Sequence, residues 1–433
     1  MSRSKILVRA AAALLSSATL LSTACIASAS SRPQATPYPI AIGVVYPYSG
    51  GSGFIGLHAQ SSTFAAADEI NADGGVLGHK IAVDPVDTKG DPADALTNVA
   101  KFVATTSHIF FLIGPGSDSG PEIVPVLNTD KLVMMSAAGQ SEFDRSHYPY
   151  FWRAVAPDAA NGVAMAIYAK QQGWLRVATV FGSDQGSQGD LPGIVAGIKS
   201  LHLNLVSELN VSPDQPSYQS EVARVVATNP QVIFTETDPT TAATFFGELT
   251  RQHTGTIHFI ATQAGVQTSY MDPFRSGVGA TQFAKEYLTV SNAAAKPNAS
   301  TAQFEKSLLG TKALGQVPDP SKYLTSPNTA NGYQTVVLSA LAATAAKSVT
   351  GSVFNKEIMS IANPGAGKTV VYTYAQGVKL LKQGKSIRYI GPGGPFDFNT
   401  YHNSYGGQVV EGVDAHGNYV ERAFISAQKI QSS

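Results

Sequence analysis

Residues 42–103 read IGVVYPYSGGSGFIGLHAQSSTFAAADEINADGGVLGHKIAVDPVDTKGDPADALTNVAKFV. The β-branched start predicts a strand, which runs into a Gly/Ser-rich loop and then a helix. A Gly74-Gly75 turn, a second strand and a second helix follow, with Asp91 as the helix N-cap and Pro92 at its first position. This βαβα order predicts a parallel sheet whose first strand-to-helix loop is polar and open to a ligand.

Three short segments of this stretch carry a family resemblance. They are Pro47-Tyr48-Ser49-Gly50 after the strand, Asp68–Ala72 with Gly74-Gly75 at the helix end, and Gly90-Asp91-Pro92 before the next helix. Together they resemble the start of the mature solute-binding proteins of ABC importers, the leucine/isoleucine/valine-binding family. The resemblance implies an α/β protein with two doubly wound parallel-sheet lobes joined by three crossover segments, the type I periplasmic binding protein or Venus-flytrap fold. It also implies capture and delivery of a ligand, without catalysis.

The rest of the chain repeats the alternation of strands and helices. Ile109–Ile113 and Val177–Phe181 are apolar runs typical of strands covered on both faces, and each is followed by a polar loop. The length exceeds that of one ordinary hydrophobic core, which favours two lobes. We expect a signal peptide and flexible tether over 1–36, a first lobe over 37–153 plus 289–388, and a second lobe over 154–288 plus 389–433.

The N-terminus has the pattern of a secretory signal. Three cationic side chains precede the apolar run Ala10–Leu21. Cys25 is the only cysteine, so an intrachain disulfide is excluded. Its position resembles a bacterial lipobox, in which the cysteine is acylated and becomes the new N-terminus, although Ser22 stands where that pattern prefers leucine. The alternative is cleavage after Ala27-Ser28-Ala29, which would discard Cys25.

Composition argues against a strongly charged partner. Removal of residues 1–24 leaves 27 basic against 30 acidic side chains, and 14% of residues are charged. Neither figure indicates the basic surface that nucleic-acid binding requires, so we expect no nucleic-acid partner. We expect a secreted monomer in the periplasm or on the outer face of the cell membrane, which touches the membrane only through a lipid anchor. Its expected partners are a small-molecule ligand and an ABC permease in the membrane.

The ligand site is expected at the strand ends. In open α/β sheets, ligands bind beyond the carboxyl ends of the strands, so the loops that follow the strands are the candidates. The predicted ligand-binding residues are Tyr48, Ser52, Phe54, Ser117, Asp118, Ser119, Gly139, Gln140, Ser141, Gln185, Ser187, Asp238 and Gln263. Tyr48 and Phe54 either line the cleft or pack on the rim of their own lobe.

The loop Ser117-Asp118-Ser119 precedes a helix, whose N-terminus favours an anion. The resemblance implies that a serine cluster here holds a ligand carboxylate. Asp118 conflicts with that role, because two like charges ~4 Å apart at an effective dielectric constant of ~20 repel by about 4 kcal/mol. Either Asp118 and Ser119 only cap the helix at Pro121, or the ligand is not a simple carboxylate.

Two further positions depart from the resemblance. Amino-acid binders of this family use a glutamate for the ligand ammonium where this chain has Gln263, a neutral amide, and only Asp238 offers a charge instead. A tyrosine of the family is replaced by Gln185-Gly186-Ser187. The sequence therefore leaves several ligand classes open: an amino acid, an amide, a urea-like compound or an organic acid.

Catalytic, metal and cofactor motifs are missing from the sequence. There is no G-x-S-x-G elbow and no H-E-x-x-H pair, and Gly365–Thr369 lacks the first glycine of a phosphate-binding loop because Ala362 stands there. We therefore expect no enzyme activity, no metal and no cofactor. Two alternatives stay open, a sensory binding protein of the same fold that serves a receptor kinase, and a secreted α/β hydrolase.

Overall fold

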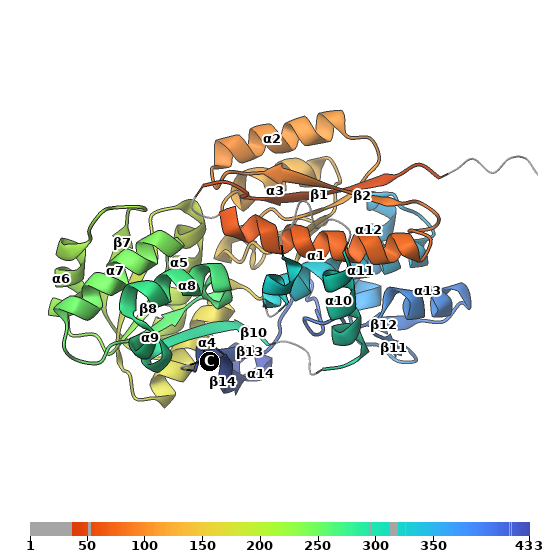
Figure 1. The fold of residues 1–433 in the computed structure, drawn as a ribbon. Helices are drawn as coiled ribbons and strands as arrows, with labels where there is room; N and C mark the ends of the chain where they lie inside the picture. The colour runs from red at the N-terminus through yellow and green to blue at the C-terminus, as the bar shows by residue number, and fades with distance from the viewer. Residues whose placement is uncertain are drawn as a thin grey trace, which may run out of the picture. The chain divides into compact units, whose positions relative to one another are not determined.

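The computed structural model describes residues 37–50, 53–293, 297–311, 319–324, 326–414, 416 and 418–433 (Figure 1). The predicted signal segment, Cys25 and Ser52 lie outside these residues. Most of the described chain forms two α/β parts of different size, each built on its own sheet. We call the part built on the five-stranded sheet lobe 1 and the part built on the seven-stranded sheet lobe 2.

Lobe 1 contains an all-parallel sheet in the order β2-β1-β3-β4-β5. Its strands are β1 (Ile40–Tyr46), β2 (Ile81–Asp87), β3 (Ile109–Ile113), β4 (Met134–Ser136) and β5 (Phe151–Arg153). The order reverses between β2 and β3 about β1, as in doubly wound sheets. Because every strand runs the same way, all five carboxyl ends lie at one edge.

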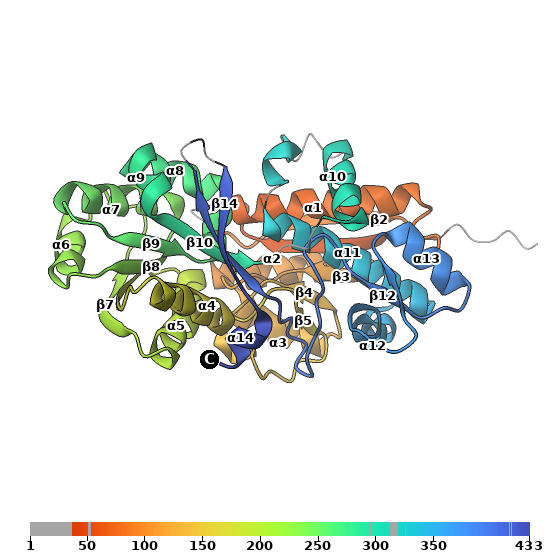
Figure 2. The ribbon, with the colours of Figure 1, turned by 90° about the horizontal axis from the view of Figure 1, so that it is seen from below.

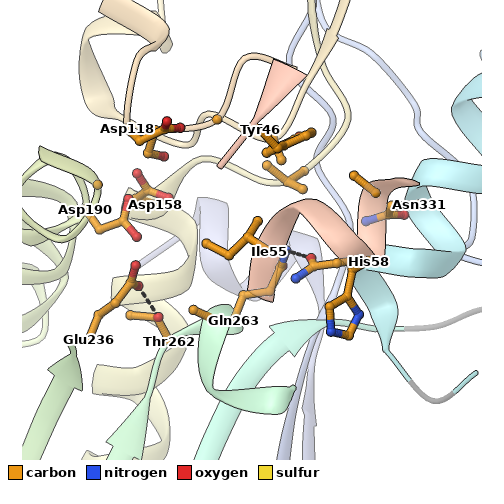
Figure 3. A pocket seen from close by; sticks show the side chains of 18 of the residues that line it. Tyr46, Ile55, His58, Asp118, Asp158, Asp190, Glu236, Thr262, Gln263 and Asn331 are labelled. Carbon is orange, nitrogen blue, oxygen red and sulfur yellow. Dashed lines mark hydrogen bonds between the residues drawn. The ribbon is translucent and has the colours of Figure 1, made fainter. Parts of the chain in front are cut away.

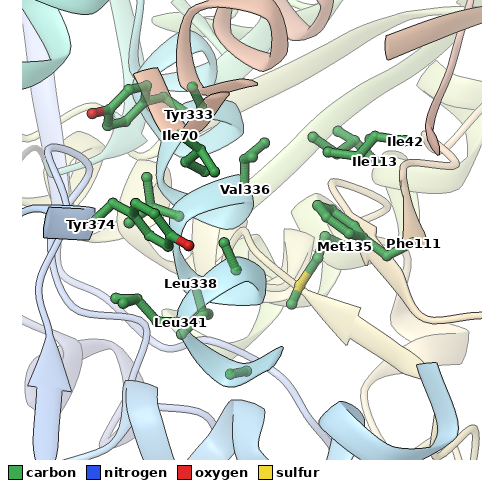
Figure 4. Packing of buried hydrophobic residues seen from close by; sticks show 14 of the residues in the cluster. Ile42, Ile70, Phe111, Ile113, Met135, Tyr333, Val336, Leu338, Leu341 and Tyr374 are labelled. Atoms are coloured by element: carbon green, nitrogen blue, oxygen red, sulfur yellow. The ribbon is translucent and has the colours of Figure 1, made fainter. Parts of the chain in front are cut away.

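Helices cover both faces of this sheet. One face carries α1 (Gly53–Ala72), α10 (Ala299–Gly310), α11 (Pro327–Ala346), α12 (Gly351–Ala362) and α13 (Tyr374–Lys382); the other carries α2 (Pro92–Thr105) and α3 (Gly120–Thr129). Successive side chains of a strand point to opposite faces, so Ile42 and Val44 pack under α11 while Val45 packs under α2 and α3. Figure 4 shows Ile42, Phe111 and Met135 facing Val336 and Leu338 of α11.

Lobe 2 contains a seven-stranded sheet in the order β14-β13-β10-β9-β8-β6-β7. Its strands are β6 (Arg176–Gly182), β7 (Asn204–Val211), β8 (Val232–Glu236), β9 (His258–Ala261), β10 (Tyr287–Asn292), β13 (Gln408–Val413) and β14 (Tyr419–Ile425). The pairings among β6 to β10 are parallel, whereas β13 and β14 are antiparallel additions beside β10 (Figure 2). The predicted α/β fold with two wound lobes is confirmed, with a mixed rather than purely parallel second sheet.

The helices of lobe 2 also form two layers. One contains α4 (Asp158–Gln171), α5 (Gln185–Ser200) and α14 (Ala427–Gln431); the other contains α6 (Gln219–Ala227), α7 (Pro239–Gln252), α8 (Thr268–Val278) and α9 (Ala280–Glu286). The polar loop expected after Val177–Phe181 is short, because α5 begins at Gln185. Asp184 explains the early start, because its Oδ1 accepts the backbone N–H of Ser187 at 3.0 Å as an N-cap.

Two of the expected lobe boundaries cut through elements that belong together. The boundary at 288/289 falls inside β10, which pairs along its length with β9 and β13 and so belongs to lobe 2. The boundary at 388/389 falls in β12 (Ile387–Tyr389), which pairs with β11 (Thr369–Val371). Phe396 and Phe398, which follow β12, are buried in the core of lobe 1. Removal of their apolar rings from water favours this position. After β12 the chain returns to the second sheet only at β13.

Among the described residues, no single helix has the length and apolar character needed to cross a membrane; α11 and α12 pass such a test only as a pair, with a 109° bend between them.

Candidate ligand-binding cavity

A cavity of about 180 Å³ lies where the strand ends of the two lobes meet. Lobe 1 contributes Tyr46 at the end of β1 and Asp118 after β3; lobe 2 contributes Glu236 at the end of β8 and Thr262 after β9 (Figure 3). This is the place that the topology of open α/β sheets predicts for a ligand.

The structure brings about half of the predicted site residues to this cavity. Those that line it are Phe54, Ser117, Asp118, Ser187, Asp238 and Gln263. Those that lie outside its lining are Tyr48, Ser119, Gly139, Gln140, Ser141 and Gln185. Ser52 is outside the described residues. Binding by the first group remains a prediction.

The residues outside the lining hold the surrounding loops. The hydroxyl of Tyr48 donates to the Val44 carbonyl at 3.3 Å, and its ring lies against Gly56, so it packs on its own lobe. Gln140 Nε2 donates to the Ser117 carbonyl at 2.7 Å. Gln185 Nε2 instead donates to Glu122 Oε2 of α3 at 3.0 Å, which links α5 of lobe 2 to lobe 1. These side chains position the cavity wall without forming it.

Asp118 does not cap the helix that follows it. Ser119 is the N-cap residue of α3 by backbone geometry, and its side chain makes no capping hydrogen bond. Asp118 Oδ2 accepts the Thr88 hydroxyl at 2.5 Å and lies in the cavity wall. Burial raises the pKa of Asp118, and the nearby Asp184 raises it further. Asp118 is therefore not a helix cap, and its carboxyl belongs to the cavity wall.

Three carboxyl groups that the sequence analysis missed meet on the lobe 2 side. Asp158 begins α4, Asp190 lies inside α5, and Glu236 ends β8. The Asp190 carboxyl lies close enough to the other two to interact with both, and Glu236 also accepts the Thr262 hydroxyl. Burial raises the pKa of all three, that of Asp158 to about 7, and like charge adds to the rise for Asp190. Without a cation, these groups hold protons that isolated carboxyls would release.

The wall as a whole is acidic. Six of its described side chains are carboxylic acids and none is lysine or arginine: Asp118, Asp158, Asp184, Asp190, Glu236 and Asp238. The one basic ring is His58, whose pKa burial lowers to about 4, so it is neutral at pH 7. Arg153 lies close behind the wall, but it is fully buried and pairs with Asp144 Oδ1 at 2.7 Å. Its guanidinium also donates to the carbonyls of Gly139 and Gln140.

A chain of side-chain amides runs along another part of the wall and connects the lobes. Gln263 Nε2 donates to Asn328 Oδ1 of α11 at 2.6 Å, and Gln263 Oε1 accepts Asn292 Nδ2 at 2.8 Å. Asn292 Oδ1 in turn accepts Gln408 Nε2 at 2.8 Å, and Gln408 Oε1 accepts Asn161 Nδ2 at 3.3 Å. All five residues line the cavity.

Hydrogen bonds to backbone groups fix which end of these amides is the oxygen and which is the nitrogen. Asn161 Nδ2 also donates to the Val290 carbonyl at 2.9 Å, and the Asn292 backbone N–H donates to Gln263 Oε1 at 3.4 Å. Both amide atoms of Gln263, Asn292 and Gln408 therefore have assigned roles, as has the amide nitrogen of Asn161.

Apolar side chains form the remaining wall, mostly from lobe 1. They are Tyr46, Phe54, Ile55, Ile113, Met135 and Ile194. In Figure 3, Tyr46 and Ile55 lie across the cavity from the three clustered carboxyls. Within the described part of the chain, no group of three or more His, Cys, Asp or Glu side chains is arranged to hold a metal ion. The arrangement fits an organic solute with one apolar and one polar end.

Comparison with known proteins agrees with this architecture. Residues 39–404 match the family described as periplasmic binding protein. The Leu/Ile/Val-binding protein of Escherichia coli strain K12 is 26% identical over 256 residues, covering 58% of this chain and 65% of that protein. The matches thus span less than two thirds of the first curated relatives.

Solved structures of low sequence identity share the fold. The leucine binding protein LivK of Thermotoga maritima superposes with a TM-score of 0.69 at 18% identity, covering 89% of this chain and 99% of that one. A solute binding protein of R. palustris in complex with benzoate gives 0.68 at 15% identity, covering 90% and 96%. With most of its length matched by the family and its fold shared with substrate-binding proteins, the chain belongs to the periplasmic binding protein family.

Proposed function

We propose that this protein captures a small polar metabolite between its two lobes and delivers it to the permease of an ABC importer. One observation carries the proposal: a cavity at the strand ends of both sheets, with polar groups from both lobes in one wall. Ligands of α/β sheets bind at such edges. Membership of a family of binding proteins supports the same conclusion.

Closure around the solute follows from where the contacts lie. A solute in the cavity touches lobe 1 and lobe 2 together, so only the closed arrangement makes both sets of contacts. Two hydrogen bonds between the lobes support this mechanism, Gln185 to Glu122 and Gln263 to Asn328. The permease then distinguishes the closed from the open protein.

We further propose that Cys25 is acylated and that residues up to Thr36 tether a monomer to the outer face of the membrane, in the periplasm or beyond a single membrane. The solitary cysteine after Leu21-Ser22-Thr23-Ala24 supports this proposal. Replacement Cys25→Ser should release the full-length protein from the membrane fraction into the soluble extracytoplasmic fraction. An unchanged membrane fraction would contradict lipidation and would leave solute binding untouched.

The direct test is to denature the purified protein and to identify released small molecules by mass spectrometry. We expect one solute per chain, which rebinds the refolded protein in calorimetry with 1:1 stoichiometry. At 100 times its dissociation constant it should stabilise the protein by ~2.7 kcal/mol. Chemical conversion of the solute by the purified protein would contradict a binding role.

A further inference from the structure

The charge of the cavity wall restricts which solute can enter. Six carboxyl side chains line the cavity, and the described part of the lining has no lysine or arginine. The nearest guanidinium, that of Arg153, is already paired with Asp144. An anion enclosed here is repelled by the carboxylates of the wall, whereas a cation is attracted to them and favours the charged form of the clustered carboxyls.

The free hydrogen-bonding groups of the wall point the same way. Asn161 and Gln267 are 8% and 1% exposed, and their oxygens Oδ1 and Oε1 are buried without a hydrogen-bond partner among the described residues. The orientation of Asn161 is fixed, because its Nδ2 donates to the Val290 carbonyl. Buried acceptors without donors are costly, and an ammonium group brings three donors and no acceptor.

The wall also indicates what the charged group is attached to. Tyr46, Ile55 and Met135 form an apolar surface, and Figure 3 shows Tyr46 and Ile55 across from the carboxyl cluster. An inorganic cation would leave this surface without a partner, and no metal-holding group of side chains occurs in the described part of the chain. The cavity thus matches an ammonium group on a compact apolar body.

Resting on the proposed function, we propose that the transported solute is an organic amine that carries a positive charge and no carboxylate. The ammonium lies among Asp158, Asp190 and Glu236, and the hydrocarbon part lies against the lobe 1 wall. A zwitterionic amino acid fits poorly, because its carboxylate would need the Ser117–Ser119 loop. In that loop the Asp118 carboxyl already faces the cavity.

Four compounds that share the isobutyl group of leucine test this proposal: leucine, leucinamide, 3-methylbutylamine and 4-methylpentanoate. Calorimetry at pH 7.5 with the mature wild-type protein should show leucinamide and 3-methylbutylamine binding at least tenfold tighter than leucine, and 4-methylpentanoate not at all. Tighter binding of leucine or 4-methylpentanoate would overturn the cationic ligand while leaving solute capture in place. Stabilisation by calcium or magnesium chloride, without stabilisation by the amines, would also overturn it.

The solute released from denatured protein decides the case in which none of the four binds. A released amine without a carboxylate supports the proposal, and a released acid or neutral compound overturns it. If no solute is released and none of the four compounds binds, the proposed function itself fails together with this inference.

Two variants locate the cation. Glu236→Gln and Asp190→Asn should each weaken 3-methylbutylamine binding at least tenfold, while thermal melts and near-ultraviolet circular dichroism show a folded protein. The matched control is Glu221→Gln on α6, where the carboxylate pairs with Arg224 at the surface; its amine affinity should stay that of wild type. Wild-type amine affinity in both cavity variants would overturn the assignment.

Discussion

Gln263 Nε2 lies 2.6 Å from Asn328 Oδ1, and this hydrogen bond joins the two lobes at the wall of the cavity. Gln263 is the second residue after β9 in lobe 2, whereas Asn328 lies in the first turn of α11 in lobe 1. The other end of the Gln263 amide accepts Asn292 Nδ2. One side chain thus connects the two lobes with the chain of amides that lines the cavity.

Replacement Gln263→Leu should therefore weaken solute binding by about tenfold. The change removes the bond to Asn328 and leaves the half-buried amides of Asn328 and Asn292 without this partner, which costs roughly 1–3 kcal/mol. Calorimetry with the solute released from the purified protein would measure the affinity, and stopped-flow fluorescence would show faster release. Gln215→Leu, at an exposed turn, is the control. An unchanged release rate would mean that this bond does not hold the closed form.

The carboxyl cluster should make the ligand-free protein sensitive to pH. Acids whose pKa is raised on folding, such as Asp158 to about 7, keep their protons in the folded state while the unfolded chain loses them above about pH 4. Their contribution to stability is full below that pH and is lost as the pH rises toward 7. His58 and His258, with pKa values lowered to about 4, act in the opposite direction between about pH 6.5 and 4.

Comparison of Asp190→Asn with wild type separates these effects, because the histidines are common to both proteins. We expect the variant to gain roughly 1–2 kcal/mol of unfolding free energy at pH 7.5, within the usual range for single substitutions, and less at pH 5. Urea titrations at the two pH values measure the difference. The neighbouring charges Asp184, Arg153 and Asp144 remain in both proteins. A gain of equal size at both pH values would show that the Asp190 charge has no part in it.

The sequence predicted the position of the cavity better than the side chains that line it. Loops after strands were identified by rule, which brought in Asp118, Asp238 and Gln263. Asp190 escaped because it lies five residues inside α5, on the helix face turned to the cavity. Glu236 could have been predicted from the sequence. It directly follows the apolar run Val232–Thr235, so the rule that selected Asp238, two residues later, applies to it as well.

For the fold, local pattern predicted the strands and helices but not the course of the chain between the lobes. Residues 287–292 alternate in a way that suits a strand of either lobe, and only pairing with β9 and β13 places them in lobe 2. Phe396 and Phe398 likewise carry no local sign of the core that they enter. Both depend on contacts between residues far apart in sequence, which periodicity does not report.

The contact between α4 and α5 should depend on the absence of side chains. A Cβ added to Gly197 would lie 2.3 Å from the carbonyl carbon of Gly162, so the two helix backbones meet there. We expect Gly197→Ala to destabilise the protein by about 2–3 kcal/mol, as overpacked sites do. Gly310 of α10 is the control, because a Cβ there has no neighbour within 4 Å. Gly310→Ala should be neutral or stabilising, by up to about 1 kcal/mol. Equal melting temperatures for the two variants would contradict the close approach.

The ion pair of Arg153 and Asp144 should be the most sensitive polar contact of the scaffold. Arg153 is fully buried, and its guanidinium holds the carbonyls of Gly139 and Gln140 behind the cavity. Asp144→Ala leaves that charge without its partner, which costs about 3–5 kcal/mol of unfolding free energy. Glu221→Ala, which removes the partner of exposed Arg224, should cost less than about 1 kcal/mol. Chemical denaturation of both variants measures the contrast, and a loss at Asp144 as small as that at Glu221 would be incompatible with a buried pair.

Asp118 should decide whether the lobe 1 loop accepts a carboxylate. Its carboxyl faces the cavity and accepts the Thr88 hydroxyl, beside the N-terminus of α3 that would otherwise attract an anion. Asp118→Ser removes a repulsion of up to about 4 kcal/mol at ~4 Å and an effective dielectric constant of ~20. We therefore expect 4-methylpentanoate, which should not bind wild type, to bind Asp118→Ser measurably in calorimetry, and 3-methylbutylamine to bind it more weakly than it binds wild type. Asp91→Asn, at the exposed cap of α2, should change neither affinity. If the carboxylate affinity of Asp118→Ser equals that of wild type, Asp118 serves only to hold Thr88, and the preference for cations rests on the lobe 2 cluster alone.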